Sequence, residues 1–371
     1  MKKYTKLAGI ASVAFLIAGC QDSEENAEGT NTESTEESAE NENETEGNGS
    51  SESPDEAASE TDENDSNENP DEPANEAEED TGSENTEEST HETDEDDSIT
   101  YAGTQETPHY FIGSHYIESE EDDITQSYTA FSIARDEEAQ LSYEDRIEKS
   151  LINEDPSEQD ILNSYTDLAA DRPKLDIYFK EEGNELSTTS AQSGLFYDSL
   201  FGISDLYGIE EISFFNPEGE QDIIVAERGV KEPIIVKDER GVTRGYYTIY
   251  DTDREETLFL AGGDVEEQVE NDQGDPLSFS DTVEAMKTVD HEDAFYSSAI
   301  VEGIEIVHTS MTDNRIATVQ YTMDEDIVTE ADRIVFERAM QLTALDFHAW
   351  EIRLVNDTTE EFITYPLVGN E

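Results

Sequence analysis

The sequence predicts an α+β protein: two tandem small α/β sandwich domains, each a sheet with helices on one face, after a disordered acidic tether. Three observations carry this prediction. They are an apolar leader that ends at the only cysteine, a long acidic tract, and two series of short strands that alternate with helical periodicity. These features divide the chain into residues 1–20, 21–100, 101–228 and 229–371.

Residues 1–20 have the features of a bacterial lipoprotein signal peptide. Lysines precede an apolar run from Leu7 to Ile17, and Ile17-Ala-Gly-Cys20 resembles a lipobox, with Ile where Leu is commoner. The alternatives are a signal peptide cut elsewhere and a short membrane helix, but the run is shorter than the roughly 20 residues that span a bilayer. We therefore expect lipidation of Cys20 and anchoring at the extracytoplasmic face of the cell membrane.

Residues 21–100 have the composition of a disordered acidic linker. They contain 33 Asp and Glu and no Lys or Arg, and small polar residues make up most of the rest. Such a segment lacks the apolar surface that would offset the entropy cost of ordering it. A flexible coil of this length spans roughly 50 Å, and repulsion between its charges extends it further. We expect it to hold the folded part away from the membrane.

The remaining residues are also strongly acidic, with 63 Asp and Glu against 17 Lys and Arg. This excess disfavours nucleic acid and anionic lipid as partners. It favours a halophilic protein whose surface is solvated in salt and whose stability rises as salt screens the repulsion. Cation binding is the alternative, but the candidate segments 251–253 and 270–275 lack the full calcium-loop pattern and its closing Glu. We predict no bound metal.

Strand and helix patterns fall into two series after Tyr101. In the first we expect strands at 110–112, 128–133, 175–179 and 209–215, and helices at 143–152 and 187–206. In the second we expect strands at 233–236, 246–250, 257–260, 304–308, 316–321 and 350–355, and helices at 278–288 and 329–345.

The two series contain an internal repeat. Residues 175–216 and 317–356 share a strand, a turn, a helix and a strand, and both end in Glu-Ile-x-(Phe/Leu)-x-Asn, 140 residues apart. A chance match between two strand–helix–strand units is the alternative. The repeat favours two domains of similar size with a boundary at 228/229, each large enough to bury its own core.

The second copy resembles the GerMN domain of bacterial sporulation and spore-germination proteins. The resemblance rests on Ser298-Ala-Ile300-x-x-Gly303, on Asn314-Arg-Ile-Ala-Thr-Val-Gln-Tyr321, on Met340-Gln-Leu-Thr343 and on Glu351-Ile-Arg-Leu-Val-Asn356. Val301-Glu302 replaces the family's Pro, and Gln320 replaces its Asp. A lipoprotein signal followed by two tandem copies is also a layout of this family. The resemblance implies small sheets with helices on one face that act by assembly, in sporulation or germination, without catalysis or cofactor.

The usual signatures of an enzyme are missing from the sequence. A single Cys excludes structural disulfides within the chain, and the six His residues show no metal-ligand spacing. No HExxH, GxSxG, P-loop or GxGxxG motif occurs. We predict no catalytic residue, no cofactor and no metal site, so that Cys20 is the only predicted functional residue.

Three function classes remain open. The first is an envelope scaffold that binds other envelope proteins or itself, with the membrane reached through the lipid anchor. The second is a solute- or ion-binding lipoprotein, which should have a deep interdomain cleft lined by convergent polar groups. The third is an envelope hydrolase. Phe347 and Trp350 are expected to anchor a helix against the last strand, with a partner-binding surface as the alternative.

Overall fold

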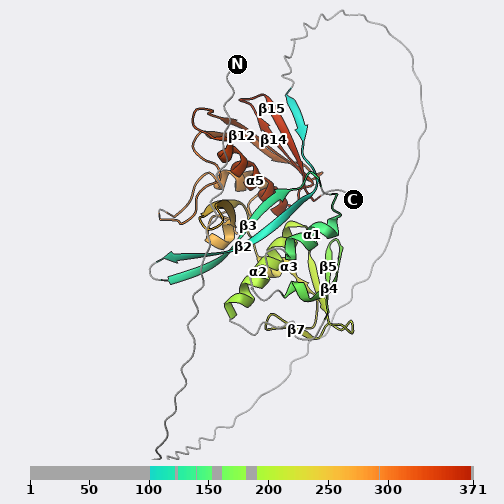
Figure 1. Ribbon diagram of the computed structural model, residues 1–371. Helices are drawn as coiled ribbons and strands as arrows, with labels where there is room; N and C mark the ends of the chain where they lie inside the picture. Colours follow the sequence, from blue (N-terminus) through green and yellow to red (C-terminus); the bar gives the residue numbers. More distant parts are fainter. Residues whose placement is uncertain are drawn as a thin grey trace, which may run out of the picture. The chain divides into compact units, whose positions relative to one another are not determined.

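The computed structural model describes residues 101–121, 124–138, 140–152, 161–180, 190–291 and 293–368 (Figure 1). The predicted signal peptide with its lipidated Cys20, and the predicted linker 21–100, lie outside these residues. Within the described ranges, no helix has both the length and the apolar character that a membrane crossing requires.

The first repeat extends from Tyr110 to Ile235 and is preceded by a short strand. In chain order the elements are β1 (Ala102–Gln105), β2 (Tyr110–Glu121), β3 (Ile124–Arg135), α1 (Tyr143–Ile152), η1 (Leu162–Ser164), β4 (Tyr165–Asp171), β5 (Lys174–Phe179), α2 (Ser190–Leu206), β6 (Glu211–Phe215), β7 (Ile223–Val225), β8 (Arg228–Val230) and β9 (Ile234–Ile235).

The second repeat extends from Tyr246 to Pro366 and follows a short helix. The elements are α3 (Val236–Arg240), β10 (Tyr246–Asp251), β11 (Glu256–Ala261), η2 (Gly262–Val265), α4 (Phe279–Ala285), β12 (Ile304–Met311), β13 (Ile316–Met323), α5 (Glu330–Asp346), β14 (Glu351–Asn356) and β15 (Glu361–Pro366). The strand expected at 233–236 is only two residues long, because Val236 starts α3 instead.

Each repeat builds an outer sheet with the same topology, which confirms the predicted tandem α+β fold class. The strand orders are β4-β5-β6-β9 in the first repeat and, in the same direction, β12-β13-β14-β15 in the second. In both sheets a hairpin (β4-β5 or β12-β13) leads through a 17-residue helix to a parallel strand, and an antiparallel strand follows. The parallel registers also agree, since Leu175 lies opposite Ile212 and Ala317 lies opposite Ile352.

The alternation of apolar residues fixes which face of each outer sheet is buried. Every second residue of β5 is buried from Leu175 onward, as is every second residue of β13 from Ala317 to Tyr321. The residues between them are half-buried. A period of two with one dry face is the pattern of a sheet covered by helices on one side. In the second repeat α4 contacts β12 and α5 contacts β14.

A central sheet joins the two repeats, with the order β10-β11-β3-β2. Each repeat contributes its first hairpin, and the hairpins meet where Phe131 of β3 pairs antiparallel with Phe259 of β11. Both phenylalanines are buried. β3 and β11 are each the second strand of their hairpin. The antiparallel pairing of Phe131 with Phe259 therefore relates the two hairpins by a pseudo-two-fold axis that passes near this pair. With Phe131 and Phe259 taken as equivalent, the hairpin registers, extended by two residues before Tyr246, make Tyr110 equivalent to Arg244.

Strand pairing crosses the predicted boundary at 228/229. The hairpin β7-β8 spans it, and β9 lies beyond it but pairs with β6 of the first sheet. At the other end, β1 pairs in parallel with β15 and adds a fifth strand to the second sheet (Figure 1). Each predicted domain therefore contributes one strand to the outer sheet of the other, β9 to the first sheet and β1 to the second. The boundary between the two domains stays a prediction.

Candidate functional site

A cavity of about 470 Å³ lies where the carboxyl ends of α2 and α5 meet the segment from β9 to β10. We call it the junction cavity. Its volume is within the range of small-molecule pockets. The residues that line it are Asp205, Ile209, Glu210, Ile235, Lys237, Gly241, Val242, Thr243, Arg244, Pro276, Asp346, Phe347 and His348.

The two helices end in the same way, so that equivalent residues of both repeats face the junction. After α2 the backbone turns at Gly208, with a φ of 72°, and after α5 it turns at His348, with a φ of 53°. The amide nitrogens of both residues donate to the carbonyl oxygen three residues earlier, at 2.8 and 2.7 Å. Left-handed backbone is natural for Gly and strained for His. Strain of this kind is concentrated at functional sites.

The aromatic residue at the end of each helix is packed differently in the two repeats. The Tyr207 ring stacks on the Tyr110 ring at 5.4 Å, and both are fully buried. In the second repeat the guanidinium of Arg244 lies 3.9 Å from the centre of the Phe347 ring, which is only half-buried. Arg244 occupies the position of Tyr110, so a cation–π contact replaces an aromatic stack. The second repeat is polar and open where the first is closed.

Asp346 is the most deeply buried acid in the cavity lining, with 8% of its surface exposed. Its Oδ1 accepts a hydrogen bond from Thr243 Oγ1 at 2.7 Å, whereas its Oδ2 has no hydrogen-bond partner. Burial raises the pKa of this carboxyl, and the nearby Asp205 raises it further. A carboxylate at the carboxyl end of a helix also faces the negative end of the helix dipole.

His348 connects the two repeats through its ring. Its Nε2 lies 3.4 Å from Oδ1 of Asp205 on α2, and this carboxylate raises the pKa of the imidazole. Next to the cavity, Arg240 Nε and the Tyr246 hydroxyl are buried without hydrogen-bond partners. Buried polar atoms nearly always have partners, so such a group of atoms marks a place where ordered water or a ligand completes the hydrogen bonding.

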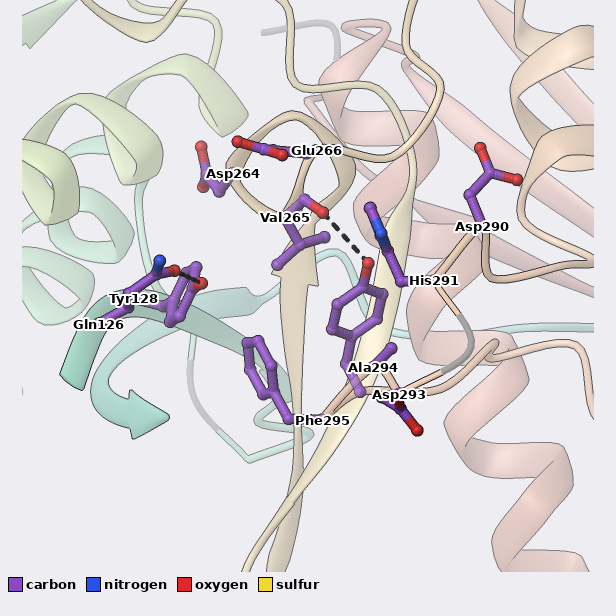
Figure 2. Close-up of a pocket in the computed structure, with 11 residues that line it drawn as sticks. Gln126, Tyr128, Asp264, Val265, Glu266, Asp290, His291, Asp293, Ala294 and Phe295 are labelled. Carbon is purple, nitrogen blue, oxygen red and sulfur yellow. Dashed lines mark hydrogen bonds between the residues drawn. The ribbon is translucent and has the colours of Figure 1, made fainter. Parts of the chain in front are cut away.

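A second cavity of about 470 Å³ lies beside η2 and is shown in Figure 2. We call it the acid–aromatic pocket. Figure 2 shows the Tyr128 and Phe295 side chains together on one side, with Asp264 and Glu266 above them and Asp290, His291 and Asp293 across the pocket. The dashed line from the Val265 carbonyl marks the hydrogen bond from the Tyr296 hydroxyl, at 3.1 Å. Neither Lys nor Arg is among the lining residues.

The acidic segments considered for cation binding act as turns. Asp251 Oδ1 accepts hydrogen bonds from the amides of Asp253 and Arg254, at 2.8 and 3.2 Å. Asn271 Oδ1 accepts from the amides of Gln273 and Asp275. Among the described residues, no group of three or more His, Cys, Asp or Glu side chains is arranged to hold a metal ion.

Sequence reasoning did not identify the junction cavity, and its expectation for Trp350 was wrong. Trp350 is 37% exposed because it precedes β14, although it is in phase with the buried Ile352 and Leu354. Phe347 is only half-buried, since it lines the junction cavity. One signal for the cavity was present in the sequence. In the internal repeat, His348 stands where the first copy has Gly208, a position that ends a helix.

Comparisons with known proteins give one structural match to report. A scan against family models and a search of the curated proteins returned no match. Among solved structures, the chain is similar to the tandem GerMN domains of the sporulation protein GerM from Bacillus subtilis. The match covers 68% of this chain and 94% of that chain, at 9% sequence identity and a TM-score of 0.37. It is a weak likeness of fold, and no functional conclusion is drawn from it.

Proposed function

We propose that this protein is a lipid-anchored, non-catalytic interaction protein of the cell envelope that docks other envelope proteins or further copies of itself. Its setting would be sporulation or germination, as the resemblance of the second repeat to GerMN domains implies. The observation that carries the proposal is a pair of equivalent open sheet edges. Within the described chain, β4 has only β5 as a neighbour and β12 has only β13.

An open edge strand presents unpaired backbone N–H and C=O groups to another chain. The longer edge is β12, which has a bulge between Ile306 and His308. The intervening Val307 is 53% exposed, although it is apolar. Because the edges are equivalent, one molecule offers two similar docking sites. A protein with two such sites on a membrane anchor is suited to bridging its partners.

The docking role is tested by placing a charge on the edge. Val307→Lys in the full chain should clearly reduce crosslinking to the partner or to a second copy in the native host, because lysine on the β12 edge opposes strand addition there and leaves only the β4 edge open. Ile334→Lys is the matched control, since Ile334 is an exposed apolar residue of α5, away from the edge. Unchanged crosslinking in Val307→Lys, with an unchanged thermal midpoint, would remove the support for edge docking.

The lipid anchor is tested separately at Cys20. Cys20→Ala should leave the protein unprocessed or release it from the membrane, because the thioether to the lipid has no other cysteine to form on. Radiolabelled palmitate should enter the natural chain only. Equal incorporation into both chains would contradict anchoring at Cys20.

A further inference from the structure

The junction cavity contains two basic side chains that lack ion pairs. The chain has a formal net charge of −76, so a Lys or Arg has many carboxylates available to it. Among the described residues, however, neither Lys237 nor Arg244 lies within ion-pair distance of a carboxylate. Within the part of the chain that the structure describes, the Arg244 guanidinium donates one hydrogen bond, to the backbone carbonyl of Asp346 at 3.2 Å. The remaining donors of this guanidinium are suited to a carboxylate ligand.

Hydrogen-bond acceptors line another part of the same cavity. Glu210 and Asp346 are both among the lining residues, and Oδ2 of Asp346 has no hydrogen-bond partner. A buried acceptor without a partner has an uncompensated desolvation cost, unless a donor from a ligand or a water molecule hydrogen-bonds to it. A ligand with a carboxylate and an ammonium group would satisfy both the basic and the acidic side chains.

Apolar side chains form part of the wall, beside the polar Asp205, Thr243 and His348. Ile209, Val242 and Phe347 contribute to the wall, and Ile235 contributes although it is 45% exposed. A large aliphatic side chain in solvent at a cavity mouth is suited to an apolar group of a ligand. At the equivalent place in the first repeat, Tyr110 covers the ring of Tyr207. The replacement of Tyr110 by Arg244 therefore supplies a positive charge at the same position.

We propose that the junction cavity binds a small zwitterion of the α-amino acid class. Arg244 and Lys237 hold its carboxylate, Asp346 and Glu210 accept from its ammonium group, and the apolar wall contacts its side chain. This activity goes beyond the docking role and does not depend on it. Solute binding is one of the function classes that the sequence leaves open.

The test is binding of the twenty standard amino acids to the full chain, purified in detergent. Thermal unfolding and titration calorimetry are measured at fixed pH and ionic strength, because salt alone changes the stability of so acidic a protein. We expect at least one amino acid to raise the midpoint and to bind saturably at one site. The best ligand is then compared with its amide and with its deaminated acid. Both should bind at least tenfold more weakly, since each lacks one of the two charges.

Variants assign the binding to the cavity. Arg244→Gln should weaken binding of the best amino acid at least tenfold, and Lys237→Glu should weaken it severalfold, because each removes a positive charge from the carboxylate position. Lys231→Glu is the matched control for Lys237→Glu, at an exposed lysine outside the cavity lining, and should bind like the natural chain. If Arg244→Gln does not fold, the binding affinity of Lys237→Glu decides whether the ligand occupies the cavity, because Lys237 is exposed on α3 and its substitution should not unfold the protein. The proposal is overturned if no amino acid binds, if the amide binds as well as the acid, or if the folded cavity variants bind normally.

Discussion

The two repeats share one backbone plan but differ at the end of their long helix. In the first repeat the rings of Tyr207 and Tyr143 meet edge to face at 6.0 Å, and in the second Phe347 and Phe279 do so at 5.5 Å. The two contacts are equivalent. What differs is the other side of the ring, which an aromatic residue covers in the first repeat and Arg244 covers in the second.

This difference shows how one of two similar units can acquire a cavity without a change of fold. Two further positions differ in the same region. Leu206 of the first repeat corresponds to the buried Asp346, and Gly208 corresponds to the strained His348. All three changes make the second repeat more polar at the junction. The first repeat has the same backbone plan without these polar residues, which makes it an internal reference.

The largest expected difference between the repeats concerns the helix-end aromatics. Tyr207→Ala should reduce the free energy of unfolding by about 4 kcal/mol, because the ring is fully buried and its hydroxyl hydrogen-bonds Ser150 at 2.9 Å. Phe347→Ala should cost only about 1–2 kcal/mol, since the half-buried ring leaves a site open to water. Urea unfolding of both variants measures the difference. Equal losses would mean that the Phe347 ring is as well packed as Tyr207.

Positions where the repeats agree should respond alike. Ile212 and Ile352 occupy the same place in β6 and β14 and are both fully inaccessible to solvent. Substituting either by Ala should cost about 3 kcal/mol, through lost burial and the cavity left behind. The same unfolding experiment serves for both. Losses that differ by more than about 1 kcal/mol would show that the two sheets are not equally well packed.

The sequence predicts the parts of this comparison that depend on local patterns. The period of two in β5 and β13 and the helices at 143–152 and 329–345 follow from nearby residues. The pairing of Phe131 with Phe259 and of β1 with β15 joins segments far apart in sequence, and no local signal specifies either. The cavity depends on that long-range pairing, because it brings Arg244 over Phe347. Only the substitution of His for Gly at the helix end gave a local sign of it.

Restoring the first repeat's residue at the buried acid should stabilise the protein. Asp346→Leu removes a carboxyl whose pKa is raised by burial, and such an acid destabilises the fold once it ionises. We expect a gain of about 1–2 kcal/mol near pH 8, reduced by the lost hydrogen bond from Thr243. The gain should shrink as pH falls toward the ordinary pKa of Asp, because the buried carboxyl is then neutral. A loss of stability at pH 8 would show that Asp346 is adequately paired.

The smallest expected effect is that of His348→Gly, which copies Gly208 of the first repeat. Glycine relieves the left-handed backbone, a gain of about 0.5–1 kcal/mol. The substitution also removes the contact with Asp205. Because that carboxylate raises the pKa of His348, the contact stabilises the fold fully below the ordinary pKa of His, about 6.5, and is lost as pH rises through the raised value. The net gain should therefore be near zero at pH 5.5 and largest at pH 8.5.

The stability gain of His348→Gly is best measured in the Asp346→Leu variant. Asp346 also raises the pKa of His348, and this contribution is absent there. A gain of the same size at both pH values would indicate backbone strain without an ion pair, and a loss at pH 8.5 would indicate that the His348 side chain stabilises the junction by packing.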